Sequence, residues 1–225
     1  MTDQQIKGCI FNLDGVIVDT GKYHYQAWRR LANQMGFDFS KEQNERLKGL
    51  GRMASLEKIL EWGGIYMPEA EKMHWADVKN NWYISLISNM KPGEVLPGVL
   101  YFLRQVRELG IKIALSSASQ NARSVLKSTN IESFFDLIID GTLIKKEKPD
   151  PQCFLQASVA MGFAPAQCLV FEDAPLGIDA AIYGGFTAIG VGRPELFPNA
   201  HLTIEGFENL RFNNLLGQLT ERVIS

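Results

Sequence analysis

The segment FNLDG, Phe11 to Gly15, places two polar side chains at the end of an apolar run and follows them with a glycine. Asn12 and Asp14 are separated by one apolar residue, so both belong to the same short turn. A carboxylate at the end of a buried strand can ligate a metal ion or transfer a proton. An amide is a poor nucleophile and carries no charge for a metal, so Asn12 limits what this turn can do.

Hydroxyl, ammonium and carboxylate side chains follow other apolar runs further along the chain. They are Ser117 in IKIALSSAS, Lys148 in KEKPDP, and Glu172 and Asp173 in CLVFED. Taken singly, such residues could cap a helix or lie on the surface. If the runs are parallel strands of one sheet, their carboxyl ends meet at the edge where ligands bind. Carboxylates there suit Mg²⁺, and hydroxyl and ammonium groups suit phosphate oxygens, so the set predicts phosphoryl transfer.

Runs of strand length alternate with helical patterns in most of the chain. The strand-like runs are 7–13 and, from about residue 96 onward, IKIALSSAS, FDLIID, CLVFED and FTAIGVG. This alternation predicts an α/β fold, a Rossmann-like parallel sheet core with helices on both faces. Between Thr20 and Met90 only helical patterns occur, which predicts a small α-helical cap domain inserted after the first strand. We expect residues 1–17 and 92–225 to form the core and residues 18–91 the cap, with KPGEVLPG as the return.

Composition narrows the classes of partner. The net charge is −2 and the pI about 6.0, and basic residues are spread along the chain, which argues against nucleic-acid and membrane partners. The three cysteines lie in apolar segments without CxxC spacing, as is typical of a reduced, cytoplasmic protein. No secretion signal is evident, and no apolar run approaches the roughly 20 residues of a membrane span. Any anionic ligand is therefore expected to be small.

Four motifs, in order, resemble those of the haloacid dehalogenase superfamily of phosphotransferases. FNLDGVIVDT is similar to DxDGxxxDT with Asn12 at the first Asp, LSSAS to the second motif, KPDP to the third and EDAPLGIDAA to the fourth. The resemblance implies that an Asp at position 12 would carry an aspartyl-phosphate while Asp14 acts as general acid and base. It also implies Mg²⁺ as cofactor, held by residue 12, Asp14 and Asp173 with Glu172 in or beside the ligand set. Ser117 and Lys148 would then stabilise the transferring phosphoryl group.

The helical insert resembles the cap of the β-phosphoglucomutases, one branch of that superfamily. DTGKYHYQAW is similar to their DTAxYHxxAW, and NERLKGLGRMASLEKIL to their NExLKGxSRxxSLxxIL. This likeness implies interconversion of β-D-glucose 1-phosphate and glucose 6-phosphate, with β-glucose 1,6-bisphosphate as intermediate and activator. A small sugar phosphate would be the only partner of a monomeric, cytoplasmic enzyme.

The same likeness implies roles for residues of the cap and of the loop facing it. His24 would couple cap closure to acid/base readiness, and the substrate would contact Trp28, Gly49, Leu50, Arg52, Lys79, Ser119, Gln120 and Asn121. Helix packing is the alternative for His24 and Trp28. Gln120 stands where similar mutases often carry Lys, and Gly51 where they often carry Ser, so the details of the phosphate clamp remain open.

Asn12 is the larger departure, because without a carboxylate the acyl-phosphate cannot form. We therefore predict that the chain as it stands is nearly inactive. The otherwise intact motifs favour an altered copy of an active enzyme over a natural non-catalytic protein. Three functions stay open: a mutase, a phosphatase of a small phosphoester or pyrophosphate, and a non-catalytic sugar-phosphate binder. Arg52 in LKGLGR favours the mutase, since a simple phosphatase needs no site for a second phosphate.

Overall fold

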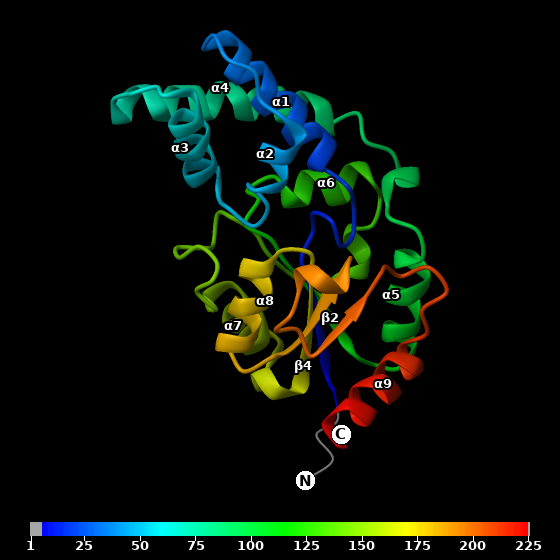
Figure 1. Cartoon of the computed structure of the whole chain (residues 1–225). Helices are drawn as coiled ribbons and strands as arrows, with labels where there is room; N and C mark the ends of the chain where they lie inside the picture. Colours follow the sequence, from blue (N-terminus) through cyan, green and yellow to red (C-terminus); the bar gives the residue numbers. More distant parts are fainter. Residues whose placement is uncertain (1–5, 225) are drawn as a thin grey trace.

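A six-stranded parallel sheet forms the centre of the molecule in the computed structural model, which describes residues 6–224 (Figure 1). Its strands are β1 (Gly8–Phe11), β2 (Lys112–Ser116), β3 (Leu137–Ile139), β4 (Cys168–Glu172), β5 (Thr187–Val191) and β6 (Leu202–Ile204). Their order is β3-β2-β1-β4-β5-β6, and all neighbours run parallel. Because β1 lies between β2 and β4, the polar residues that follow these three strands end side by side.

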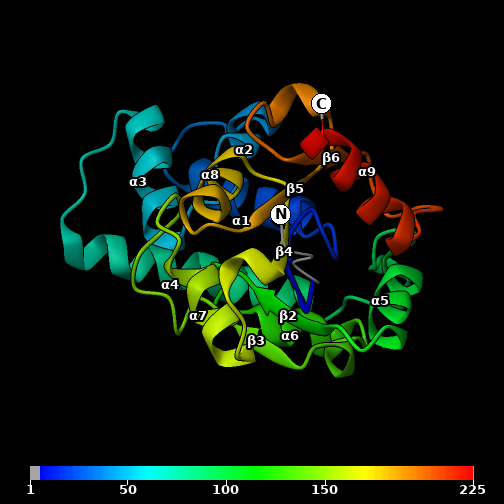
Figure 2. The same ribbon diagram turned by 90° about the horizontal axis from the view of Figure 1, so that it is seen from below.

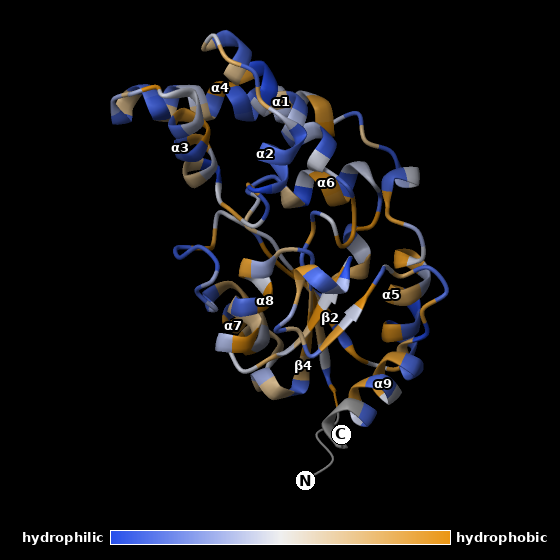
Figure 3. Ribbon diagram, in the orientation of Figure 1, coloured by the Kyte–Doolittle hydropathy of each residue, from blue (hydrophilic) through white to orange (hydrophobic). Residues whose placement is uncertain are grey.

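Helices cover both faces of this sheet (Figures 1 and 2). On one face, α5 (Val99–Glu108), α6 (Ala122–Ser128) and α9 (Phe212–Ile224) pack against the side chains of Cys9 and Phe11. On the other, α7 (Gln152–Met161) and α8 (Pro175–Tyr183) pack against Ile10. Successive strand residues point to opposite faces, which is why an almost wholly apolar run such as β1 can be buried on both sides. Figure 3 shows hydrophobic residues, in orange, along the strands at the centre of the molecule.

Four helices lie between β1 and α5 in the chain and form a layer over the carboxyl ends of the strands (Figure 1). They are α1 (Gly21–Gln34), α2 (Lys41–Glu45), α3 (Arg52–Gly63) and α4 (Glu69–Ile87). They enclose an apolar cluster of their own that includes Trp28, Leu31, Leu56 and Ile59. We call this layer the cap and the remainder the core.

The predicted fold class, a Rossmann-like parallel sheet with a small helical cap, is confirmed, while the expected boundaries at residues 17/18 and 91/92 stay a prediction. Strand β6 was not predicted, because its central residue Thr203 is polar and the segment forms no apolar run, unlike the equally short β3 within FDLIID. Short 3₁₀ turns occupy Pro92–Glu94, Glu132–Phe134, Pro165–Gln167 and Pro194–Leu196. Within residues 6–224, no helix is both long and apolar enough to cross a membrane.

Candidate active site

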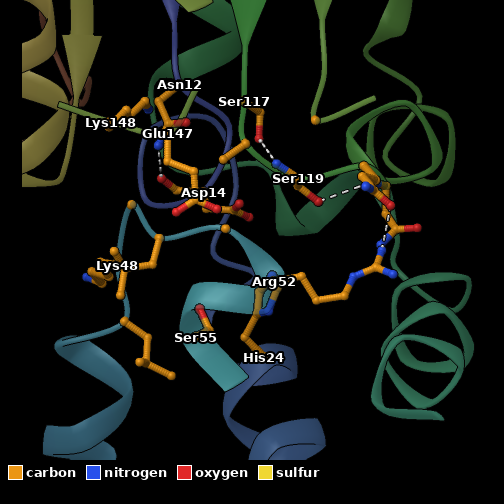
Figure 4. Close-up of a pocket in the computed structure, with 18 of the residues that line it drawn as sticks. Asn12, Asp14, His24, Lys48, Arg52, Ser55, Ser117, Ser119, Glu147 and Lys148 are labelled. Carbon is orange, nitrogen blue, oxygen red and sulfur yellow. Dashed lines mark hydrogen bonds between the residues drawn. The ribbon is translucent and has the colours of Figure 1, made fainter. Parts of the chain in front are cut away.

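A cavity of about 330 Å³ lies between the carboxyl ends of the strands and the cap (Figure 4). Apart from Glu172, the structure places every residue of the predicted site in its wall. From the core these are Asn12, Asp14, Ser117, Ser119, Gln120, Asn121, Lys148 and Asp173, and from the cap His24, Trp28, Gly49, Leu50, Arg52 and Lys79. The volume suits a small ligand.

Asn12 and Asp173 follow the neighbouring strands β1 and β4, and their side chains meet. Nδ2 of Asn12 donates to Oδ1 of Asp173 at 3.2 Å and to the main-chain oxygen of Asp14 at 3.1 Å. Gly15 permits this approach, because a Cβ there would lie 2.0 Å from Oδ2 of Asp173 and φ is +72°. Burial raises the pKa of Asp14 to about 7, and burial followed by the Glu172 charge raises the pKa of Asp173 to about 7. The turn therefore holds two carboxyl groups that change charge near neutrality.

Oxygen donors for a hard cation converge at this turn. The Asp173 carboxylate and the Asp14 carbonyl already accept from one common donor, the Asn12 amide. In residues 6–224 no three His, Cys, Asp or Glu side chains come together as a metal site. The donor set is instead one carboxylate, one main-chain carbonyl and whichever atom residue 12 presents. These groups fit Mg²⁺, which takes few protein oxygens, although Asn12 turns its NH₂ group toward them.

Lys148 and Glu172 form an ion pair beneath the cavity. The two side chains are 3% and 0% exposed, and Oε2 of Glu172 also accepts from the Ala174 amide at 3.0 Å. Gly177 makes room for this carboxylate, since a Cβ there would lie 2.1 Å from its Cδ. Although burial alone would lower the pKa of Lys148, the Glu172 charge raises it above its ordinary value. Lys148 is thus held as a cation at the cavity wall, and its partner lies behind it.

The hydroxyl groups after β2 are ordered by main-chain donors. Oγ of Ser117 accepts from the Ser119 amide at 3.1 Å, and Oγ of Ser119 accepts from the Asn121 amide at 3.2 Å (Figure 4). Nδ2 of Asn121 also donates to Oδ1 of Asn80 on α4 at 2.8 Å, which connects this loop to the cap. The loop therefore offers its side chains to a ligand while it contacts the cap.

Lys48, between α2 and α3, and Arg52, the first residue of α3, reach from the cap to the core. Nη2 of Arg52 donates to Oε1 of Gln120 at 2.9 Å, and its Nη1 lies 3.4 Å from Oδ1 of Asp77 on the cap. Lys48 reaches across to Asp173, with 3.6 Å between Nζ and Oδ2. The cap accordingly lies closed on the core, and cap cations face both ends of the cavity.

The cap interior holds a second buried lysine. Nζ of Lys79 lies 3.0 Å from Nδ1 of His24 and 4.0 Å from the centre of the Trp28 ring. Burial, and next the Lys79 charge, lowers the pKa of His24 well below its usual value, so its ring is neutral and Nδ1 can accept from Lys79. Burial, and next the Arg52 charge, lowers the pKa of Lys79. The charged form of Lys79 is therefore destabilised, and an anionic ligand would stabilise it.

Sequence reasoning missed several residues at this site. The Thr20 hydroxyl donates to Oδ1 of Asp14, and the Thr of the quoted DT pair was the available signal. Lys48, which lies inside the quoted LKGLGR segment, and Asn80, which follows the predicted Lys79, also line the cavity. Glu147 fills the space at Gly51, where a Cβ would lie 1.9 Å from its Oε1, and no pattern in the sequence marked it.

Comparison with known proteins agrees with this architecture. The family model of haloacid dehalogenase-like hydrolases matches residues 6–185. A β-phosphoglucomutase of Bacillus subtilis is 41% identical over 207 residues, which are 91% of this chain and 92% of that protein. A fructose-1-phosphate phosphatase of Escherichia coli is 28% identical over 84% of this chain and 97% of its own.

A solved structure extends the likeness to three dimensions. The crystal structure of β-phosphoglucomutase from Clostridium difficile superimposes with a TM-score of 0.93 at 41% identity, covering 98% of this chain and 100% of that one. The resemblance read from the motifs is thereby confirmed. The chain belongs to the haloacid dehalogenase-like hydrolase family, within which it is a homologue of the β-phosphoglucomutases.

Proposed function

We propose that this chain is built as a Mg²⁺-dependent β-phosphoglucomutase, acting on β-D-glucose 1-phosphate through β-glucose 1,6-bisphosphate. The observation that carries the proposal is a cavity between cap and core with a cation at each of two separate ends. Lys148 lies beside Asn12 and Asp14 at the core end, and Arg52 approaches Gln120 on the far side (Figure 4). A substrate with one phosphate fills one end only, whereas a bisphosphate fills both.

Each residue of the core end has a task in that reaction. Asp14, whose pKa burial raises to about 7, can hold and release the proton of a sugar hydroxyl near neutrality. Ser117 and Lys148 supply a hydroxyl and an ammonium for the oxygens of the transferring phosphoryl group. Bound Mg²⁺, held by Asp173, the Asp14 carbonyl and residue 12, would neutralise negative charge on those oxygens.

With Asn at position 12, the covalent step of this mechanism, formation of an aspartyl-phosphate, cannot occur. An amide cannot form the acyl-phosphate, so we propose that the chain as it stands binds sugar phosphates but turns them over very slowly. The amide keeps the shape of an aspartate and lacks the negative charge that would repel an incoming phosphate. Binding of the bisphosphate is therefore retained while catalysis is lost.

Asn12→Asp tests this function directly. The variant should convert β-glucose 1-phosphate to glucose 6-phosphate at least about 10³-fold faster than the parent, because it restores a nucleophile rather than improving a contact. The assay couples glucose 6-phosphate formation to a dehydrogenase, with Mg²⁺ and β-glucose 1,6-bisphosphate present. Asn33→Asp, which adds the same charge on the exposed surface of the cap, is the matched control and should give no gain.

A phosphatase is the second candidate, favoured by the similarity to the fructose-1-phosphate phosphatase. If the Asn12→Asp protein hydrolyses phosphoesters but leaves β-glucose 1-phosphate unconverted, the phosphatase is the correct function. If it does neither while the parent binds sugar phosphate in a titration, the chain is a binder and the mutase proposal is wrong.

A further inference from the structure

Tyr83 on α4 buries a hydroxyl group without a hydrogen bond. The residue is 1% exposed, and Oη meets no partner of suitable geometry among the described residues. Although Tyr83 is part of a cap helix, its side chain packs in the main core cluster with Leu13 and Val18 rather than in the apolar cluster of the cap. A buried, unpaired hydroxyl lowers stability, so its presence calls for a reason other than packing.

The neighbours of this hydroxyl belong to the part of the cavity that contains Asp14. The Tyr83 ring lies 4.1 Å from the His24 ring, centre to centre. Burial, and after it the Asp14 charge, raises the pKa of Tyr83, while the nearby Thr20 and Ser119 hydroxyls oppose that rise. One turn earlier on α4, Asn80 contacts Asn121 of the loop that contains Ser119. The phenol thus lies between that loop and the segment that leads from β1 into the cap.

The hydroxyls beside Tyr83 can form a directed chain. Thr20 donates its proton to Oδ1 of Asp14, which leaves the lone pairs of its oxygen free to accept from Tyr83. Oγ of Ser119 accepts from the Asn121 amide, so its own proton can go to Oη of Tyr83. Small rotations would add hydrogen bonds from Ser119 to Tyr83 and from Tyr83 to Thr20 to the existing one from Thr20 to Asp14, and the three would strengthen one another.

We propose that Tyr83 is a positioning residue, which links Ser119 through Thr20 to Asp14 when the cap is closed on a ligand. Its hydroxyl holds the Thr20 hydroxyl in the orientation that donates to Asp14. Binding of a ligand beside Ser119 is thereby coupled to the orientation of the Asp14 carboxyl at the other end of the cavity. The inference rests on the proposed function, since it gives Asp14 a proton-transfer task. No covalent bond forms or breaks in this chain of hydroxyls.

Tyr83→Phe separates this role from a structural one. In the Asn12→Asp protein, it should lower kcat about tenfold and change the KM for β-glucose 1-phosphate less than threefold. The melting temperature should stay equal or rise by a few degrees, because the variant removes an unpaired buried hydroxyl and keeps the ring. Tyr25→Phe, on α1 outside the cavity wall, should alter none of the three quantities. A melting temperature lowered by several degrees would show a structural hydroxyl and overturn the inference.

A double-mutant cycle with Thr20→Val completes the test. If Tyr83 acts through Thr20, Tyr83→Phe costs nothing further once Thr20→Val is present, so the two effects on kcat are not additive. Additive effects, or a Tyr83→Phe kcat within twofold of the parent, overturn the inference and leave the mutase function standing. If the Asn12→Asp protein hydrolyses another phosphoester instead, the proposed mutase function is wrong. The double-mutant cycle is then measured with that hydrolysis as the activity. A protein without any turnover overturns both.

Discussion

Two lysines of the site are almost equally buried, yet their surroundings differ. As whole residues, Lys148 of the core is 6% exposed and Lys79 of the cap 3%. Lys148 pairs with the Glu172 carboxylate, which raises its pKa. Lys79 lies against His24 and the rings of Trp28 and Tyr83. Burial, and next the Arg52 charge, lowers the pKa of Lys79 well below the usual value, and the Asp14 charge offsets this only in part.

This contrast shows how the two parts of the molecule divide the work. In the core, the Glu172 carboxylate balances the Lys148 charge, so Lys148 stays charged with or without a ligand. The cap leaves its cation with aromatic faces and a neutral imidazole, which compensate only in part. We expect an anionic ligand to supply the negative charge that Lys79 lacks and thereby to stabilise the cap against the core.

The largest effect in this comparison is expected for the paired lysine. Lys148→Met in the Asn12→Asp protein should abolish measurable turnover, a loss of at least about 10³-fold, because it removes a cation beside the transferring phosphoryl. It should also lower the free energy of unfolding by about 3–5 kcal/mol, since Glu172 would be left buried and unpaired. Denaturant unfolding and the coupled assay measure the two effects. Lys127→Met, an exposed lysine of α6 outside the cavity wall, should change neither by much, and a stable Lys148→Met protein would contradict the argument.

The ion pair of Lys148 and Glu172 shows what could and could not be predicted from the sequence. The motif order placed Lys148 and Glu172 near the same end of the sheet, because parallel strands bring their carboxyl ends together. Glu172 was expected in or beside a metal's ligand set, and that role stays a prediction, whereas the structure places its carboxylate behind Lys148. The direction of the side chain depends on the turn after β4 and on the space left by Gly177, neither of which periodicity encodes.

The cap was predictable as helices but not as contacts. Amphipathic spacing indicated the helices, and the family motifs indicated Arg52 and Lys79. The bond from Arg52 to Gln120 and the burial of the Tyr83 hydroxyl in the core cluster depend on how two separately folded layers meet. Contacts between residues distant in the chain leave no local pattern in a single sequence.

An intermediate effect is expected at the far end of the cavity. Arg52→Ala in the Asn12→Asp protein should lower kcat/KM for the mutase reaction about 10- to 100-fold, because Arg52 can contact only the phosphate that does not react. Hydrolysis of an ester with one phosphate should change less than threefold. Arg29→Ala, which removes an exposed arginine paired with Asp38 outside the cavity wall, is the control. Equal losses in both assays would count against a two-phosphate site.

The smallest effect is expected for the unpaired lysine, and it concerns stability. At pH 7, Lys79→Met should leave the free energy of unfolding unchanged or raise it by up to about 2 kcal/mol, because an apolar side chain replaces a buried cation without a carboxylate partner. Chemical denaturation of both proteins measures the difference. Lys58→Met, on the exposed face of α3, controls for the loss of one charge.

The pH dependence of that difference follows from the lowered pKa of Lys79. Between this folded-state pKa and the ordinary value near 10.5, the unfolded chain binds more protons, so raising the pH stabilises the parent relative to Lys79→Met. Of the groups facing Lys79, burial keeps His24 neutral and Tyr83 protonated at pH 7 to 9.5, while Arg52 stays charged. Burial raises the pKa of Asp14 to about 7 and the Lys79 charge opposes that rise, so in Lys79→Met this carboxyl takes up its charge at higher pH, which acts in the same direction. The advantage of Lys79→Met should therefore shrink from pH 7.5 to 9.5, and an unchanged difference would mean that Lys79 keeps its proton in the folded protein.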